Sequence, residues 1–284
     1  MKIFLVTTDH FSDRLWFKDD EVFRAAMNYV AIVTILTKVK VLTFILMSNH
    51  VHFVLLCDSE SAKRFIDTFK KLYGGYFSRK YKVKDYFRRV KVDIREITGE
   101  EAVERVIAYV QMNCVAANIC ASSYFYPWGT GRCFFNDNPV SGLPVGKMSR
   151  RAQIRMTRSN VSLPSSFRYC DEGYILPESY VNTEAVEALF RSPKRYNYFL
   201  NSSSKAKKIL EKDAVPSFRD QNILSSALDL CRSLFRADSI ESLNRDQKSE
   251  LLKQLRRRFG ADISQLSRVI GLTYKEAAIL LDLV

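Results

Sequence analysis

The sequence is poor in several features that would mark common classes of protein. Its 284 residues include only three histidines, and its six cysteines form no Cys-x-x-Cys pair. This argues against a zinc ribbon and favours reduced core thiols in a cytoplasmic protein. No stretch approaches the ~20 apolar residues needed to span a bilayer, and the first apolar run is too short for a signal peptide.

Acidic residues are also scarce relative to basic ones. The chain has 31 Asp and Glu against 44 Lys and Arg, a net charge of +13. Such an excess predicts a polyanionic partner, of which nucleic acid is the commonest and an anionic membrane surface the competitor.

Two of the three histidines, His50 and His52, lie one residue apart between apolar, β-branched runs at 41–47 and 53–57. Both runs are typical of strands, where side chains alternate between faces, so the two imidazoles should point the same way, about 7 Å apart, with Val51 on the other face. They could then share a metal ion if a third ligand comes from elsewhere. The spacing alone also fits two ordinary histidines, so the rest of the chain must decide.

The periodicity of the first half predicts alternating strands and helices. The expected elements are a strand at 2–8, a helix at about 20–38, strands at 41–47 and 53–57, a helix starting at 58 or 59, a strand at about 88–97 and a third helix. Thr98 and Glu101 are spaced as a capping box for the third helix. The order predicts an α+β fold, a ferredoxin-like split β-α-β antiparallel sheet with helices on one face, followed by a mainly α-helical C-terminal region. The strands beside the histidines should be central.

The pattern changes after the first half. Gly, Pro, Ser and Arg dominate from 122 to 163, which predicts a first domain at 1–135, a basic irregular linker at 136–180 and a helical region at 181–284. Residues 250–284 fit a helix-turn-helix. Its second helix is apolar and offers only Lys275 as a cation, so a packing or dimerisation unit fits equally well.

The third predicted helix carries two more candidates. Tyr109 and Asn113 are four residues apart and share a flank of its apolar stripe, where helix meets sheet. Taken alone, a tyrosine there could simply pack its ring and bond its hydroxyl to a neighbour.

These two segments together resemble a known family. Residues 46–52, Leu-Met-Ser-Asn-His-Val-His, are similar to the LMPNHVH signature of the HUH tyrosine transposases. Residues 109–117, Tyr-Val-Gln-Met-Asn-Cys-Val-Ala-Ala, resemble the helix that carries their nucleophile. Residues 9–17 and 126–128 also have counterparts there. The resemblance covers about residues 1–135 and is greatest to the REP-associated tyrosine transposase branch.

The chain departs from the family pattern at Ser48, Cys114 and Asn118, and Gly129 and Thr130 replace a serine pair that is usual beyond the tryptophan. Ser48 stands where proline is usual, which is expected to matter little. Cys114 replaces the proline after Asn113, and Asn118 replaces a glycine. We expect these two changes to extend the helix or to alter its end, which bears on the orientation of Asn113.

The resemblance implies a metal-dependent single-strand DNA transposase or strand transferase. Such an enzyme cleaves and rejoins DNA near hairpin repeats through a covalent 5′-phosphotyrosine. Tyr109 would be the nucleophile, and His50, His52 and Asn113 would bind Mg²⁺ or Mn²⁺. The partner would be single-stranded or hairpin DNA, with no membrane, and the protein would be a monomer or a homodimer.

Candidate DNA contacts come from two basic stretches. Residues 63–95 hold twelve Lys and Arg, three Asp and eight Phe and Tyr, and residues 147–158 hold no acid. Cations of this kind follow phosphates, and exposed rings stack on unpaired bases. The predicted contacts are Lys80, Tyr81, Lys82, Lys84, Arg88, Arg89, Arg150, Arg151 and Arg155.

Two other functions stay open at this point. A domesticated hairpin-DNA-binding protein that no longer cleaves would share the charge, but it has no need of the two histidines and the tyrosine together. A metal hydrolase that activates water is disfavoured because the expected sheet face supplies few carboxylates.

Overall fold

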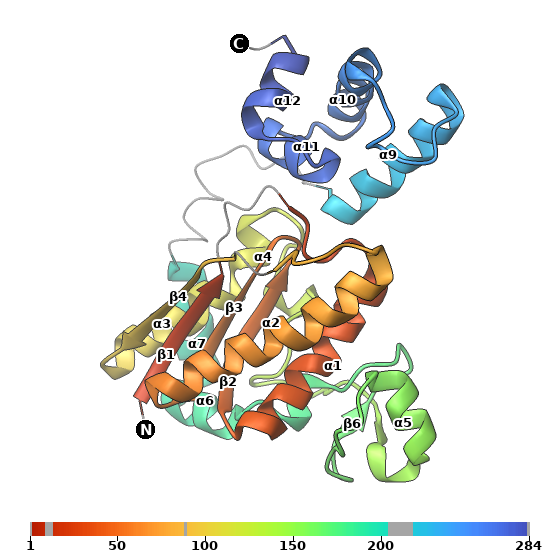
Figure 1. The fold of residues 1–284 in the computed structure, drawn as a ribbon. Coiled ribbons are helices and arrows are strands. Elements are labelled where there is room, and N and C mark those ends of the chain that lie inside the picture. The colour runs from red at the N-terminus through yellow and green to blue at the C-terminus, as the bar shows by residue number, and fades with distance from the viewer. Residues whose placement is uncertain (1, 9–13, 88–89, 204–217, 283–284) are drawn as a thin grey trace.

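The structure is a computed structural model that describes residues 2–8, 14–87, 90–203 and 218–282 (Figure 1). Its first half contains a four-stranded antiparallel sheet in the order β2-β3-β1-β4. The strands are β1 (Lys2–Thr8), β2 (Lys40–Met47), β3 (His50–Cys57) and β4 (Val92–Ile97). With α1 (Asp20–Thr37), α2 (Ser59–Tyr81) and α3 (Glu100–Gln111) they follow the predicted element order. The predicted α+β class is confirmed. Of the two strands predicted to be central, β3, which carries both histidines, lies inside the sheet, whereas β2 forms one edge.

Helices α1 and α2 begin where the sequence predicts because an aspartate caps each. Asp19 accepts a hydrogen bond from the Val22 amide at 2.9 Å, and Asp58 accepts one from the Ser61 amide at 2.8 Å. These contacts satisfy amides that the first turn of a helix leaves without partners. Helix α2 continues through Gly74 and Gly75 to Tyr81, so the glycine pair does not end it.

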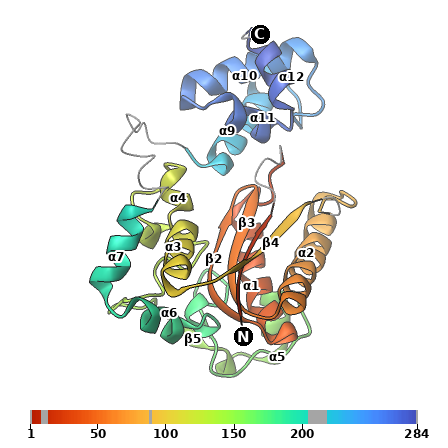
Figure 2. The same ribbon diagram turned by 90° about the vertical axis from the view of Figure 1, so that its left-hand side faces the viewer.

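The helices cover both faces of the sheet, whereas the sequence predicted one. The Phe53 ring contacts Phe65 and Phe69 of α2 at 5.2 and 5.5 Å between centroids. The neighbouring His52 ring contacts Tyr109 of α3 at 5.8 Å. Successive residues of a strand point to opposite faces, so α2 and α3 lie on opposite sides of β3, as Figure 2 shows. The alternation of a strand cannot reveal this when both faces are buried.

The predicted cap of α3 is wrong. The helix begins at Glu100 with Gly99 at the capping position, and no side chain caps it. Gly99 has a φ of 90°, which glycine adopts without steric cost. That turn leaves Thr98 one residue too early to cap, while Glu100 and Glu101 in the first turn interact favourably with the helix dipole.

The free edge of β2 is covered by the segment that follows α3. The Leu46 amide donates to the Trp128 carbonyl at 2.8 Å, and the Tyr126 hydroxyl donates to the Leu46 carbonyl at 2.7 Å. Gly129 pairs with Ile45, and a Cβ at Gly129 would lie 3.1 Å from the Phe44 carbonyl oxygen. The backbone therefore approaches β2 more closely than a larger residue allows.

The second half is mainly helical, as predicted. The elements that follow α3 are α4 (Asn113–Ala116), β5 (Leu143–Pro144), α5 (Arg150–Thr157), β6 (Arg168–Tyr169), α6 (Thr183–Phe190), α7 (Pro193–Ser202), α9 (Asp220–Phe235), α10 (Arg245–Phe259), α11 (Ile263–Ile270) and α12 (Tyr274–Leu280). Helices α5 and α7 were not predicted. The first lies inside the expected irregular linker, where the Ser149 hydroxyl caps it. In the last pair, Gly271 ends α11 with a φ of 77°, and Thr273 and Glu276 form a capping box at the start of α12.

Two hydrophobic cores divide the described residues. The first reaches from Phe4 to Phe199 and includes Val186 and Phe190 of α6. The second reaches from Ile223 to Leu281 and is built by α9 to α12, which we call the helical region. The domain limits 1–135, 136–180 and 181–284 stay predictions, although α6 and α7 pack in the first core. Among the described helices, none combines the length and the apolar character that crossing a bilayer requires.

Candidate active site

The turn between β2 and β3 sets the start of the histidine strand. It consists of Ser48 and Asn49, and the Ser48 carbonyl accepts hydrogen bonds from the amides of Trp16 and Phe17 at 2.7 and 3.0 Å. Met47 pairs with His50 across the turn. The segment before α1 thus holds the backbone from which His50 projects.

The two histidine rings lie together at the start of β3. Their centroids are 4.9 Å apart and their planes are nearly perpendicular, at 89°. His52 is 2% exposed, whereas His50 is half-buried. The Nδ1 atom of His52 lies 3.0 Å from the Thr7 hydroxyl, and Nδ1 of His50 lies 2.9 Å from Oδ1 of Asn49. Each ring is therefore oriented through Nδ1.

Tyr109 completes a row of three rings. It lies on α3, and its ring meets the His52 ring edge to face, at 5.8 Å and 84°. The side chain is half-buried, and this burial raises the pKa of the Tyr109 phenol above its ordinary value. The hydroxyl is therefore protonated at neutral pH.

Asn113 lies one turn beyond Tyr109, at a break in the helix. Helix α3 ends at Gln111, and the short helix α4 begins at Asn113. The Asn113 amide nitrogen donates to the carbonyls of Tyr109 and Val110 at 2.9 and 3.2 Å. The side-chain nitrogen of Asn113 therefore faces the helix backbone, and Oδ1 lies at the other end of the amide.

A buried polar cluster attaches α3 to β2 through Gln111, which lies between Tyr109 and Asn113 in the sequence. The Gln111 side chain is 1% exposed, and its nitrogen donates to the hydroxyls of Thr43 and Thr130 at 2.7 and 2.8 Å. The two hydroxyls lie 2.7 Å apart. Burying these groups is tolerable because they bond to one another. The sequence prediction missed Gln111, because a glutamine in a helix gives no sign of a partner on a distant strand.

A second buried contact on α3 was also missed. Glu104 is 1% exposed and accepts two hydrogen bonds from the Arg195 guanidinium of α7, at 2.5 and 2.7 Å. A buried carboxylate needs such a partner. The arginine lies 91 residues along the chain, in a helix that the sequence prediction did not include.

The predicted DNA contacts have different surroundings. Lys80 forms ion pairs with Asp19 and Glu21, and the Tyr81 hydroxyl donates to Asp19 at 2.7 Å. These two side chains are thus engaged at the start of α1. The other predicted contacts fall into two groups: Lys82, Lys84, Arg150, Arg151 and Arg155 are exposed, and Arg88 and Arg89 lie outside the described residues.

Comparison with known proteins adds a distant likeness. The sequence matches no family model and no curated protein. One solved structure, a REP-associated tyrosine transposase bound to a REP hairpin, is 10% identical and has a TM-score of 0.35, over 45% of this chain and 76% of that chain. The likeness is partial, and family membership is not established by it.

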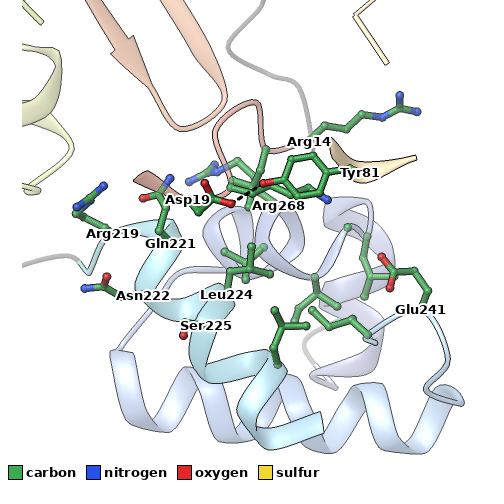
Figure 3. Close-up of a pocket in the computed structure, with 18 of the residues that line it drawn as sticks. Arg14, Asp19, Tyr81, Arg219, Gln221, Asn222, Leu224, Ser225, Glu241 and Arg268 are labelled. Atoms are coloured by element: carbon green, nitrogen blue, oxygen red, sulfur yellow. Dashed lines mark hydrogen bonds between the residues drawn. The ribbon is translucent and has the colours of Figure 1, made fainter. Parts of the chain in front are cut away.

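A cleft of about 810 Å³ separates this half from the helical region (Figure 3). The histidines and Tyr109 are not among its lining residues. Among the described residues, its charged side chains comprise four cations and four carboxylates, namely Arg14, Lys18, Arg219, Arg268, Asp19, Asp20, Glu241 and Glu276. Because these charges balance, the cleft does not favour a polyanion.

Proposed function

We propose that this protein is a metal-dependent single-strand DNA transposase or strand transferase that cleaves and rejoins DNA near hairpin repeats. The observation that supports it most is the row of rings formed by His50, His52 and Tyr109, from a strand and a helix 57 residues apart. The net charge of +13 fits a nucleic-acid substrate.

The donors present fit a Mg²⁺ or Mn²⁺ site. Two imidazole nitrogens and an amide oxygen suit a hard or borderline ion that must also hold a phosphate oxygen. Since Nδ1 of each histidine is oriented by a neighbour, Nε2 would be the ligand atom. Asn113 would offer Oδ1, because its nitrogen is bonded to the helix. When bound, the ion would stabilise negative charge on the scissile phosphate.

Tyr109 would perform the covalent step. Its phenol loses a proton, and the oxygen attacks the phosphorus while the bond from phosphorus to the 3′ oxygen breaks. The 3′ oxygen takes up a proton and leaves as a hydroxyl, and the 5′ phosphate stays on Tyr109. Attack by a 3′-hydroxyl reverses the step, so rejoining needs no ATP.

The decisive experiment is to trap the covalent adduct. The full chain is incubated with single-stranded hairpin DNA and Mn²⁺ and run on a denaturing gel. We expect an adduct with the native chain. We also expect one with the control variant Tyr124→Phe, which removes the hydroxyl of a tyrosine that is 44% exposed. We expect none with Tyr109→Phe. An adduct that persists in Tyr109→Phe would refute the assignment of the nucleophile.

The same experiment separates the alternative functions. Hairpin binding without an adduct, under any divalent metal, would favour the non-cleaving hairpin-binding protein. A metal hydrolase would release cleaved DNA without an adduct. Among the described residues, no three His, Cys, Asp or Glu side chains form a metal-binding group.

A further inference from the structure

The helical region contacts the turn that carries His50. The Ser48 hydroxyl donates to Oδ2 of Asp220, the first residue of α9, at 2.6 Å. Next to it, the Gln221 side chain donates to the Phe17 carbonyl at 2.6 Å, and Arg219 pairs with Asp20 at 2.7 Å. Figure 3 shows Arg219 and Gln221 on the wall of the cleft near Asp19. Arg219, which precedes α9, and the first two residues of α9 thus meet the turn, the segment before α1 and the first residue of α1.

Asp220 is itself fixed by α11. The Arg268 guanidinium donates to both of its oxygens, at 2.7 and 3.2 Å, and Gln265 donates to Oδ1 at 2.9 Å. The side chain of Asp220 is 3% exposed and that of Arg268 is 22% exposed. An ionised carboxylate so little exposed depends on these donors, which makes its position well defined.

Ser48 links this buried carboxylate to the histidine. Its carbonyl holds the Trp16 and Phe17 amides, its hydroxyl holds Asp220, and the next residue, Asn49, lies 2.9 Å from Nδ1 of His50. A continuous series of contacts therefore runs from Arg268 through Asp220, Ser48 and Asn49 to the His50 ring. A proline or alanine at position 48 could not donate to Asp220.

We propose that Asp220 is a positioning residue for His50, so that docking of the helical region sets the geometry of the metal site. The effect on metal binding rests on the proposed function, because His50 is a metal ligand only under that proposal. It assigns the helical region a role at the catalytic site that is separate from any contact with DNA.

Two measurements on the full chain test the inference. The first is the imidazole NMR resonances, which are easily assigned because the chain has three histidines. The second is the dissociation constant for Mn²⁺. We expect Ser48→Ala and Asp220→Asn each to shift the His50 resonances and to weaken Mn²⁺ binding roughly tenfold, the lower end for partners outside the ligand shell. Ser48→Thr, which keeps a hydroxyl at this position, should leave the His50 resonances and the Mn²⁺ affinity close to those of the native chain.

The matched control is Ser249→Ala. It removes a serine hydrogen bond of the same 2.6 Å length, to the Leu280 carbonyl, within the helical region. It should leave the His50 resonances and Mn²⁺ affinity unchanged. If Ser48→Ala and Asp220→Asn leave the His50 resonances in place, the inference is overturned. If the native chain fails to bind Mn²⁺, the proposed function fails, and the resonances still decide whether Asp220 positions His50.

Discussion

Replacing Gln111 by leucine tests how α3 is held against the sheet. The substitution keeps the volume of the side chain but removes two hydrogen bonds, to Thr43 and Thr130. At about 1 kcal/mol each, the loss is about 2 kcal/mol. The two hydroxyls keep their mutual contact at 2.7 Å, and Thr130 keeps the Phe44 carbonyl, so no group is left without a partner. We therefore expect the unfolding free energy to fall by about 1–2 kcal/mol.

Tryptophan fluorescence during urea unfolding measures this change in the right part of the molecule. Both tryptophans of the chain, Trp16 and Trp128, are buried in the first core, at 1% and 2% exposure. The signal therefore reports that core and leaves the helical region to circular dichroism. A change in the urea midpoint without a change in slope indicates an effect on stability alone.

The matched control is Gln254→Leu, which removes one exposed hydrogen bond to Glu250 on α10. It should leave the fluorescence transition unchanged, because surface substitutions alter stability by about 0.5 kcal/mol or less. Since Gln111 lies between Tyr109 and Asn113, its replacement should also slow adduct formation. A loss of stability below about 0.5 kcal/mol in Gln111→Leu would show that the buried cluster does not hold the helix.

Three further predictions follow from the same contacts. Burial opposes ionisation of Asp19, but hydrogen bonds from Tyr81, Lys80 and the Val22 amide outweigh burial and lower the pKa of Asp19. The stability that this lowered pKa contributes is present above the unfolded pKa of about 4 and is lost as pH falls below that value. Tyr81→Phe should therefore reduce the loss of stability that acid unfolding curves record. Because burial raises the pKa of Tyr109, the rate of adduct formation should rise between about pH 6 and pH 9, and a flat profile would show that loss of the phenol proton does not limit the rate. In Gly131→Ala, the new Cβ would lie 2.1 Å from the Ser123 carbonyl oxygen, so we expect unfolding to become easier by about 2–4 kcal/mol, measured by the same fluorescence transition.

The first half of the fold could be predicted because its signals are local. Alternating apolar residues mark the strands, and Asp19 and Asp58 mark the helix starts within a few residues. The row of His50, His52 and Tyr109 followed from the resemblance, because no spacing rule brings a helix residue to a strand. The predicted roles of these residues and of Asn113 stay predictions.

What could not be predicted depends on distant partners. Ser48 was expected to matter little, yet its hydroxyl bonds to Asp220, 172 residues later. The ion pairs of Lys80 with Asp19 and Glu21 were not predicted, and its contact with DNA stays a prediction. A charged or hydroxyl side chain shows its chemistry in the sequence, whereas its partner depends on which elements meet in three dimensions.

The division of helices between the two faces of the sheet has an evolutionary consequence. Phe53 belongs to the aromatic layer with α2, whereas His52, one residue earlier, belongs to the layer with α3. The side chains of one layer point away from those of the other, so a substitution in one layer does not directly touch the side chains of the other. A descendant could therefore exchange its histidines and tyrosine for other residues and keep the aromatic layer that folds it, so chains with this sheet and a different chemistry are expected among its relatives.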